Sequence, residues 1–153
     1  MEIRTEKKLV EIIQTTNTYI AIDGKEFDNK TDCENYEKEL ESAKLRAEAE
    51  VFEIKELEDT YPLDAEGGEV PENHCYKWYK VNNTEELNKV ANLYNADFGE
   101  FKDYPQTICI EYDYHYDEYR WIYTLSDMQR QTVEFWQKHG YDVEFKESAK
   151  DEI

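Results

Sequence analysis

Two segments of the sequence concentrate carboxylates, and they are the first candidates for binding chemistry. Residues 56–72 contain seven acidic residues and no basic one, and residues 97–118 contain seven acidic residues against Lys102 alone. Carboxylates two residues apart on a strand are roughly 6–7 Å apart, a spacing on the scale of phosphates along a nucleic-acid strand. These segments therefore predict a surface that pairs with Lys and Arg side chains of a nucleic-acid-binding groove. The alternative is a solvated acidic face that only maintains solubility.

Tyrosines interleave with these acids in a hairpin predicted over residues 107–124. Tyr112 and Tyr114 continue an apolar alternation, so we expect their rings to face the core. Tyr116 and Tyr119 lie near the turn, where large rigid side chains suit a binding surface. The predicted partner-binding residues are therefore Glu58, Asp59, Asp64, Glu66, Glu69, Glu111, Asp113, Tyr116, Asp117, Glu118 and Tyr119.

Catalytic chemistry has less support in the sequence. Glu111, Asp113 and His115 share one strand face and are donor types found in metal-dependent hydrolases. On one strand they spread over about 13 Å, too far to meet a single ion, so we predict no metal site, no cofactor and no catalytic residue. The chain has no G-x-S-x-G motif, no Cys–His context and no phosphate-binding glycine loop. A small enzyme that uses a metal or acts on a signalling nucleotide remains an alternative function, and an acidic adaptor protein is another.

The composition favours a cationic partner and argues against direct nucleic-acid binding. The 153 residues include 37 Asp and Glu against 18 Lys and Arg, which gives a formal net charge of -19. Binding to DNA, RNA or an anionic membrane needs the opposite sign. The 3 cysteines are far apart, which suggests neither a disulfide framework nor a zinc site. Without an apolar leader or a stretch of about 20 apolar residues, we expect a cytoplasmic protein.

These candidate residues need a scaffold, and hydrophobic periodicity predicts a single α+β domain over residues 1–153 with a frayed acidic tail from about 147. We expect an antiparallel sheet of about five to seven strands with about three helices packed on one side. The expected strands lie within residues 9–13, 19–22, 51–54, 76–81, 107–114, 119–124 and 141–145.

Capping signals predict where the three helices begin and end. Capping boxes at Thr31–Glu34 and Ser126–Gln129 predict the starts of the first and third helices. Asn83 or Thr84 is expected to cap the second helix. Gly140 is expected to end the third, because glycine tolerates the left-handed conformation that terminates helices.

The segment Ile20 to Phe27 (IAIDGKEF), followed by a helix with Cys33, Tyr36 and Glu37, resembles a pattern in small accessory proteins of bacterial phages and mobile elements. This resemblance covers the first third of the chain. The overall profile is small, strongly acidic and aromatic-rich, and it is similar to anti-CRISPR and anti-restriction proteins that imitate DNA. The resemblance implies a stoichiometric inhibitor without catalytic residues, whose target is a Cas-type nuclease or a restriction enzyme.

Overall fold

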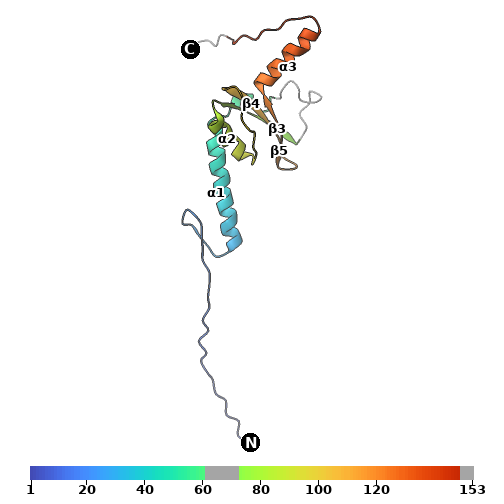
Figure 1. The fold of residues 1–153 in the computed structure, drawn as a ribbon. Helices are drawn as coiled ribbons and strands as arrows, with labels where there is room; N and C mark the ends of the chain where they lie inside the picture. Colours follow the sequence, from blue (N-terminus) through green and yellow to red (C-terminus); the bar gives the residue numbers. More distant parts are fainter. Residues whose placement is uncertain (61–72, 149–153) are drawn as a thin grey trace. The chain divides into compact units, whose positions relative to one another are not determined.

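The computed structural model describes residues 1–60 and 73–148 (Figure 1). The chain divides into two compact units, Met1–Glu41 and Ser42–Ile153. Three helices and five strands form in the described part of the chain, so the α+β class is confirmed. The strands form two antiparallel sheets, one of two strands and one of three, where a single larger sheet was expected. The prediction of one domain concerns how the units associate, and it stays a prediction.

The first unit contains a small hairpin that packs against the start of a helix. Strand β1 (Tyr19–Ile20) pairs antiparallel with β2 (Glu26–Phe27), and the turn between them uses Gly24 at φ +92°. The Tyr36 ring of helix α1 (Lys30–Glu50) packs on Phe27 with centroids 5.2 Å apart. The Tyr36 hydroxyl also donates a hydrogen bond to the Asp23 carboxylate at 2.7 Å.

The strand expected over residues 9–13 is not formed. Residues 1–18 have no helix or strand, and Leu9 and Ile13 are 99% and 91% exposed. The partner of β1 is instead β2, which lies directly after the Gly24 turn. A tight turn closes a short loop at little entropic cost, so the local pairing forms here.

Two of the three predicted N-cap residues are wrong, each by two residues. The side chain of Asn29, not Thr31, accepts from the backbone N–H of Thr31 at 2.7 Å and so caps α1. The hydroxyl of Thr124, not Ser126, accepts from the backbone N–H of Asp127 at 3.2 Å and caps α3 (Leu125–Lys138). In both cases an equivalent acceptor lies two residues earlier, and residue types alone do not choose between overlapping capping candidates.

The other two helix ends agree with the sequence. Asn83 caps α2 (Thr84–Leu93) by accepting from the Glu86 backbone N–H at 2.9 Å. Gly140 follows the end of α3 at φ +86°, the left-handed conformation expected of a terminating glycine.

The second unit is built on a three-stranded antiparallel sheet. Strands β3 (His74–Val81), β4 (Gln106–Asp113) and β5 (Glu118–Thr124) are adjacent in chain order, with a register irregularity in β4 between Glu111 and Tyr112. Two further expected strands are absent. Residues 51–54 make one isolated bridge, Glu53 to Tyr79, before a short 3-10 helix (Lys55–Leu57), and residues 141–145 form no strand.

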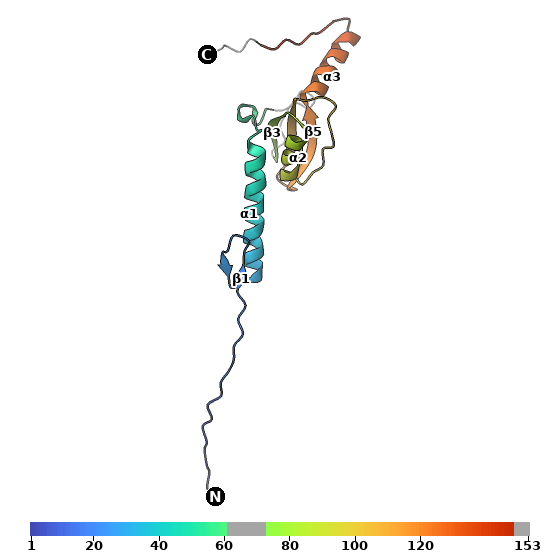
Figure 2. The same ribbon diagram turned by 60° about the vertical axis from the view of Figure 1, so that its left-hand side comes forward.

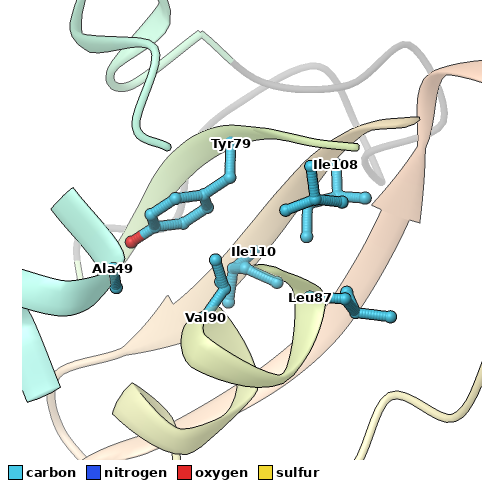
Figure 3. Packing of buried hydrophobic residues seen from close by; sticks show 7 residues of the cluster. Ala49, Tyr79, Leu87, Val90, Ile108 and Ile110 are labelled. Atoms are coloured by element: carbon cyan, nitrogen blue, oxygen red, sulfur yellow. The ribbon is translucent and has the colours of Figure 1, made fainter. Parts of the chain in front are cut away.

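Both faces of this sheet are buried. On one face Tyr79, Ile108 and Ile110 pack with Leu87 and Val90 of α2 (Figure 3), and Figure 2 shows α2 in front of the sheet. On the other face a second cluster is formed by Tyr76, Trp78, Cys109 and Met128 of α3. Neighbouring residues of a strand point to opposite faces, so α2 and α3 cover different faces, and packing of the helices on one side is not confirmed.

Candidate binding site

Two of the predicted partner-binding carboxylates point into the second unit. Glu111 and Asp113 lie on the α3 face of the sheet, where their side chains are 13% and 4% exposed. Glu111 accepts from His74 Nδ1 at 2.7 Å, from the Tyr76 hydroxyl at 3.2 Å and from the Tyr123 hydroxyl at 2.9 Å. Such a carboxylate stabilises the sheet and offers little charge to a partner.

Asp113 is compensated even more completely. Its carboxylate accepts from Arg120 Nε and Nη2, both at 3.0 Å, and from the backbone N–H groups of His115 and Tyr116 at 2.9 and 3.3 Å. Burial opposes ionisation of this carboxyl, but the hydrogen bonds from Arg120 and from the two backbone amides outweigh burial, so its pKa lies below the ordinary value.

His74 joins the two carboxylates into one network. Its Nδ1 lies 2.7 Å from Glu111 and its Nε2 lies 3.2 Å from Asp113. Both contacts are hydrogen bonds only when both ring nitrogens carry protons, because a carboxylate accepts and does not donate. His74 therefore bridges Glu111 and Asp113, and Arg120 also donates to Asp113.

The hairpin turn carries the predicted residues that do face solvent. Asp117 and Glu118 are exposed, and the Tyr116 ring is 63% exposed beneath the Arg120 guanidinium at 4.9 Å. Tyr119 is half-buried and packs edge-on against Phe98, with ring centroids 5.4 Å apart. Its ring therefore packs at the edge of the hydrophobic core and is not fully open to a partner.

The 56–72 segment is described only at its start. Glu58 forms an ion pair with Lys77 at 3.1 Å, and Asp59 is exposed. Asp64, Glu66 and Glu69 lie outside the described residues.

The Phe98–Tyr119 contact also places a second acidic loop beside the hairpin. Asp97 precedes Phe98 and Glu118 precedes Tyr119, so the loop after α2 and the start of β5 meet at this ring pair. We call the exposed carboxylates of these two adjacent segments, Asp97, Glu100, Asp117 and Glu118, the hairpin–loop surface; Glu118 is opposite Asp113 in the register and therefore lies on the α3 face of the sheet. Asp97 and Glu100 were not among the predicted binding residues, although both belong to the acidic 97–118 segment.

A pocket of about 460 Å³ opens next to the hairpin, within the second unit. Four tyrosines line it and form a continuous chain of ring contacts. The centroid distances are 6.2 Å for Tyr79–Tyr94, 5.9 Å for Tyr94–Tyr112 and 5.8 Å for Tyr112–Tyr114. We call this cavity the tyrosine pocket. Tyr114 was expected to face the core, but it lies at this pocket and is 62% exposed.

The tyrosine hydroxyls remain protonated at neutral pH. Burial raises the pKa of Tyr79 to about 12 and also raises that of Tyr94, and these two hydroxyls lie 2.7 Å apart. Burial and a hydrogen bond to Asp117 raise the pKa of Tyr112 to about 12. Two effects raise the pKa of Tyr114 to about 12: the larger is its contact with the Cys75 thiol, and the second is burial.

Charged side chains of both signs also line the tyrosine pocket. Lys77 forms ion pairs with Glu53 at 3.3 Å and with Glu58 at 3.1 Å. Burial disfavours its charged form, but the contacts with Glu58 and Glu53 outweigh burial and raise the pKa of Lys77. Arg46 and Glu50, one turn apart on α1, form no ion pair with another residue in the described part of the chain.

Sequence reasoning missed this pocket because its walls come from distant segments. α1 contributes Arg46 and Glu50, β3 contributes Cys75, Lys77 and Tyr79, α2 leads into Tyr94, and the β4–β5 hairpin contributes Tyr112, Tyr114 and Asp117. The one available signal was the high tyrosine content, 13 residues, but composition does not say which rings share a cavity.

Other kinds of site have no counterpart in the described residues. Within residues 1–60 and 73–148, no group of three or more His, Cys, Asp or Glu side chains is placed to hold a metal ion. None of the helices found in these ranges combines the length and apolar character that crossing a bilayer requires. No family model, no curated protein and no solved structure matches the chain.

Proposed function

We propose that the protein is a stoichiometric binding protein for a cationic surface of a nucleic-acid-binding protein. The observation that carries this proposal is the hairpin–loop surface. In the described part of the chain, no cationic side chain lies within ion-pair distance of Asp97, Glu100 or Asp117. Glu118 lies 3.5 Å from Arg120, which also pairs with Asp113. The form implied by the sequence resemblance is an inhibitor of a Cas-type nuclease or a restriction enzyme that occupies its nucleic-acid groove.

The expected energetics combine several weak charge contacts with aromatic contact area. Each exposed ion pair contributes about 0–1 kcal/mol, so no single carboxylate accounts for tight binding. Tyr114 and Tyr116 are 62% and 63% exposed beside these carboxylates and supply apolar area to the same partner. The net charge of -19 steers a basic partner at long range, so the association rate should fall as salt increases.

Glu111 and Asp113 are not part of this proposed surface. Their carboxylates already have partners within the protein, because both contact His74 and Asp113 also pairs with Arg120. The proposal therefore moves the contact from the inward-facing residues of β4 to the turn and the neighbouring loop.

A charge-reversal pair tests the proposal. DNA cleavage by purified Cas nucleases and restriction enzymes is titrated with the protein, with Asp97→Lys/Glu100→Lys, and with a control, Asp142→Lys/Glu144→Lys. The control changes the net charge equally at two exposed residues after α3. We expect inhibition that saturates at a fixed molar ratio, is weakened at least about tenfold by the first pair and is nearly unchanged by the control.

Two results would contradict the proposal. Equal effects of the two double variants would mean that only net charge matters. Loss of substrate or nuclease at substoichiometric protein would identify an enzyme instead of a binding protein.

A further inference from the structure

We propose that the tyrosine pocket is a binding site for a guanidinium or ammonium group. The pocket lies on the sheet face opposite to the Glu111–Asp113 network, so it is a separate feature of the second unit. Its volume of about 460 Å³ falls in the range of small-molecule sites, roughly 300–1,000 Å³.

The wall of the pocket suits a cation. Aromatic rings attract cations through the negative potential above the ring, and several rings around one cavity are the usual device for binding organic ammonium groups. Tyr79, Tyr94, Tyr112 and Tyr114 form such a group of rings, linked by contacts of 5.8–6.2 Å between centroids. Since the hydroxyls remain neutral, the rings contribute their faces and their O–H dipoles rather than fixed charge.

The charges at the pocket favour the same sign of ligand. Lys77 is already compensated by Glu53 and Glu58, so it offers little positive charge to a ligand. Glu50 has no ion pair in the described part of the chain, and Asp117 accepts only the Tyr112 hydroxyl there. These two carboxylates lack a cation, and they would pair with a ligand's guanidinium or ammonium group.

Of the two cations that line the pocket among the described residues, Lys77 is paired and Arg46 is not, so Arg46 is the charge that opposes a cationic ligand. It is exposed on α1, one turn before Glu50, and forms no ion pair within the described residues. A cationic ligand should therefore bind more tightly when Arg46 loses its charge, whereas an anionic ligand should bind less tightly. Arg46 thus decides the sign of the ligand experimentally.

The cationic group could come from two sources with the same chemistry. One is an Arg or Lys side chain of the basic partner, and this source rests on the proposed function. The other is a free organic cation such as spermidine or an arginine derivative, which does not. Asp117 belongs both to the pocket and to the hairpin–loop surface, so a side chain inserted in the pocket would continue the contact made by that surface.

Calorimetric titration of the full chain tests the site with three probes: N-acetylarginine amide, spermidine, and an Arg-containing peptide beside its citrulline counterpart. We expect saturable binding of a cationic probe and none of the citrulline peptide. Glu50→Gln should weaken binding about 3- to 10-fold, and Arg46→Gln should strengthen it by a similar factor. Glu134→Gln, which removes the same charge from α3, should have no effect.

A second matched pair tests the aromatic wall. Tyr114→Leu removes a ring that lines the pocket, and Tyr116→Leu removes an equally exposed ring that does not. We expect only Tyr114→Leu to weaken binding, with unchanged thermal unfolding for both variants. The two positions lie in the same hairpin, so a general effect on the turn would change both.

The outcomes separate the site from the proposed function. Weaker binding in Arg46→Gln, or equal effects of Glu50→Gln and Glu134→Gln, would overturn the cation site, as would the absence of binding by all three probes. Binding of the free cations that persists in Asp97→Lys/Glu100→Lys, the variant expected to lose nuclease inhibition, would support the site independently of the partner. If no nuclease is inhibited while a free cation still binds as described, the proposed function fails and the cation site stands.

Discussion

Replacing Glu111 with Gln is expected to destabilise the second unit by about 2–4 kcal/mol without reducing partner binding by the folded protein. The substitution keeps the shape of the side chain and removes its charge. Glu111 was a predicted contact residue, so this variant distinguishes a structural carboxylate from a binding one.

The magnitude follows from the contacts of Glu111. Its carboxylate accepts from His74 at 2.7 Å, from Tyr76 at 3.2 Å and from Tyr123 at 2.9 Å. Hydrogen bonds to a charged group contribute about 1.5–3 kcal/mol each, and the Gln amide would turn a donor toward groups that also donate. Some hydroxyls can rotate to new acceptors, so the expected loss is smaller than the sum of three bonds.

Urea unfolding followed by circular dichroism measures this loss, with Glu118→Gln as the matched control. Glu118 is in the same hairpin, but its side chain is 55% exposed and its Arg120 contact is 3.5 Å, so we expect a change of less than about 1 kcal/mol. Tyr123→Phe removes one donor to Glu111, and the double variant should show a coupling energy of at least about 0.5 kcal/mol. The structural role is refuted if Glu111→Gln unfolds like the control, or if it weakens partner binding at full folding.

Three further predictions concern pH and capping. The folded-state pKa of Asp113 lies below its ordinary value of 3.8, so the ionised carboxylate stabilises the fold above pH 3.8, and this stabilisation is lost as pH falls through the folded-state pKa. Asp113→Asn should therefore flatten the decline in thermal stability below about pH 4. Because burial raises the pKa of Tyr79 from 10.0 to about 12, stability should fall as pH rises above about 10, and tyrosinate absorbance should show a late-ionising group that Tyr79→Phe diminishes. Asn83→Ala removes the acceptor for the Glu86 N–H and should cost about 1 kcal/mol in urea unfolding, whereas Asn92→Ala, at an exposed α2 position, should not.

Much of the second unit was predictable because its signals are local. The runs that became β3, β4 and β5 carry β-branched and aromatic residues, and α2 and α3 carry helical periodicity with suitable caps. The errors fall where local signals compete or are weak. Residues 9–13 are apolar but find no partner strand in the described residues, and residues 51–54 make a single bridge.

The candidate site was predictable only in part. The exposed acids of the turn, Asp117 and Glu118, follow from the hairpin pattern, because a turn between two strands reaches solvent. Glu111 and Asp113 were predicted to bind a partner because they belong to the acidic 97–118 segment, and acidic residues usually face water. That rule fails for β4, since Ile108, Cys109 and Ile110 are all fully buried and the sheet is covered on both faces.

The sequence by itself determined the sign and amount of charge, the positions of the three main strands and the three helices, and the abundance of tyrosine. These properties depend on composition and on neighbours within a few residues. Only the tertiary structure decided which carboxylates are neutralised inside and which tyrosines enclose a pocket. Those outcomes depend on contacts between residues as distant as Arg46 and Asp117, or His74 and Glu111, and a local pattern contains no information about such pairs.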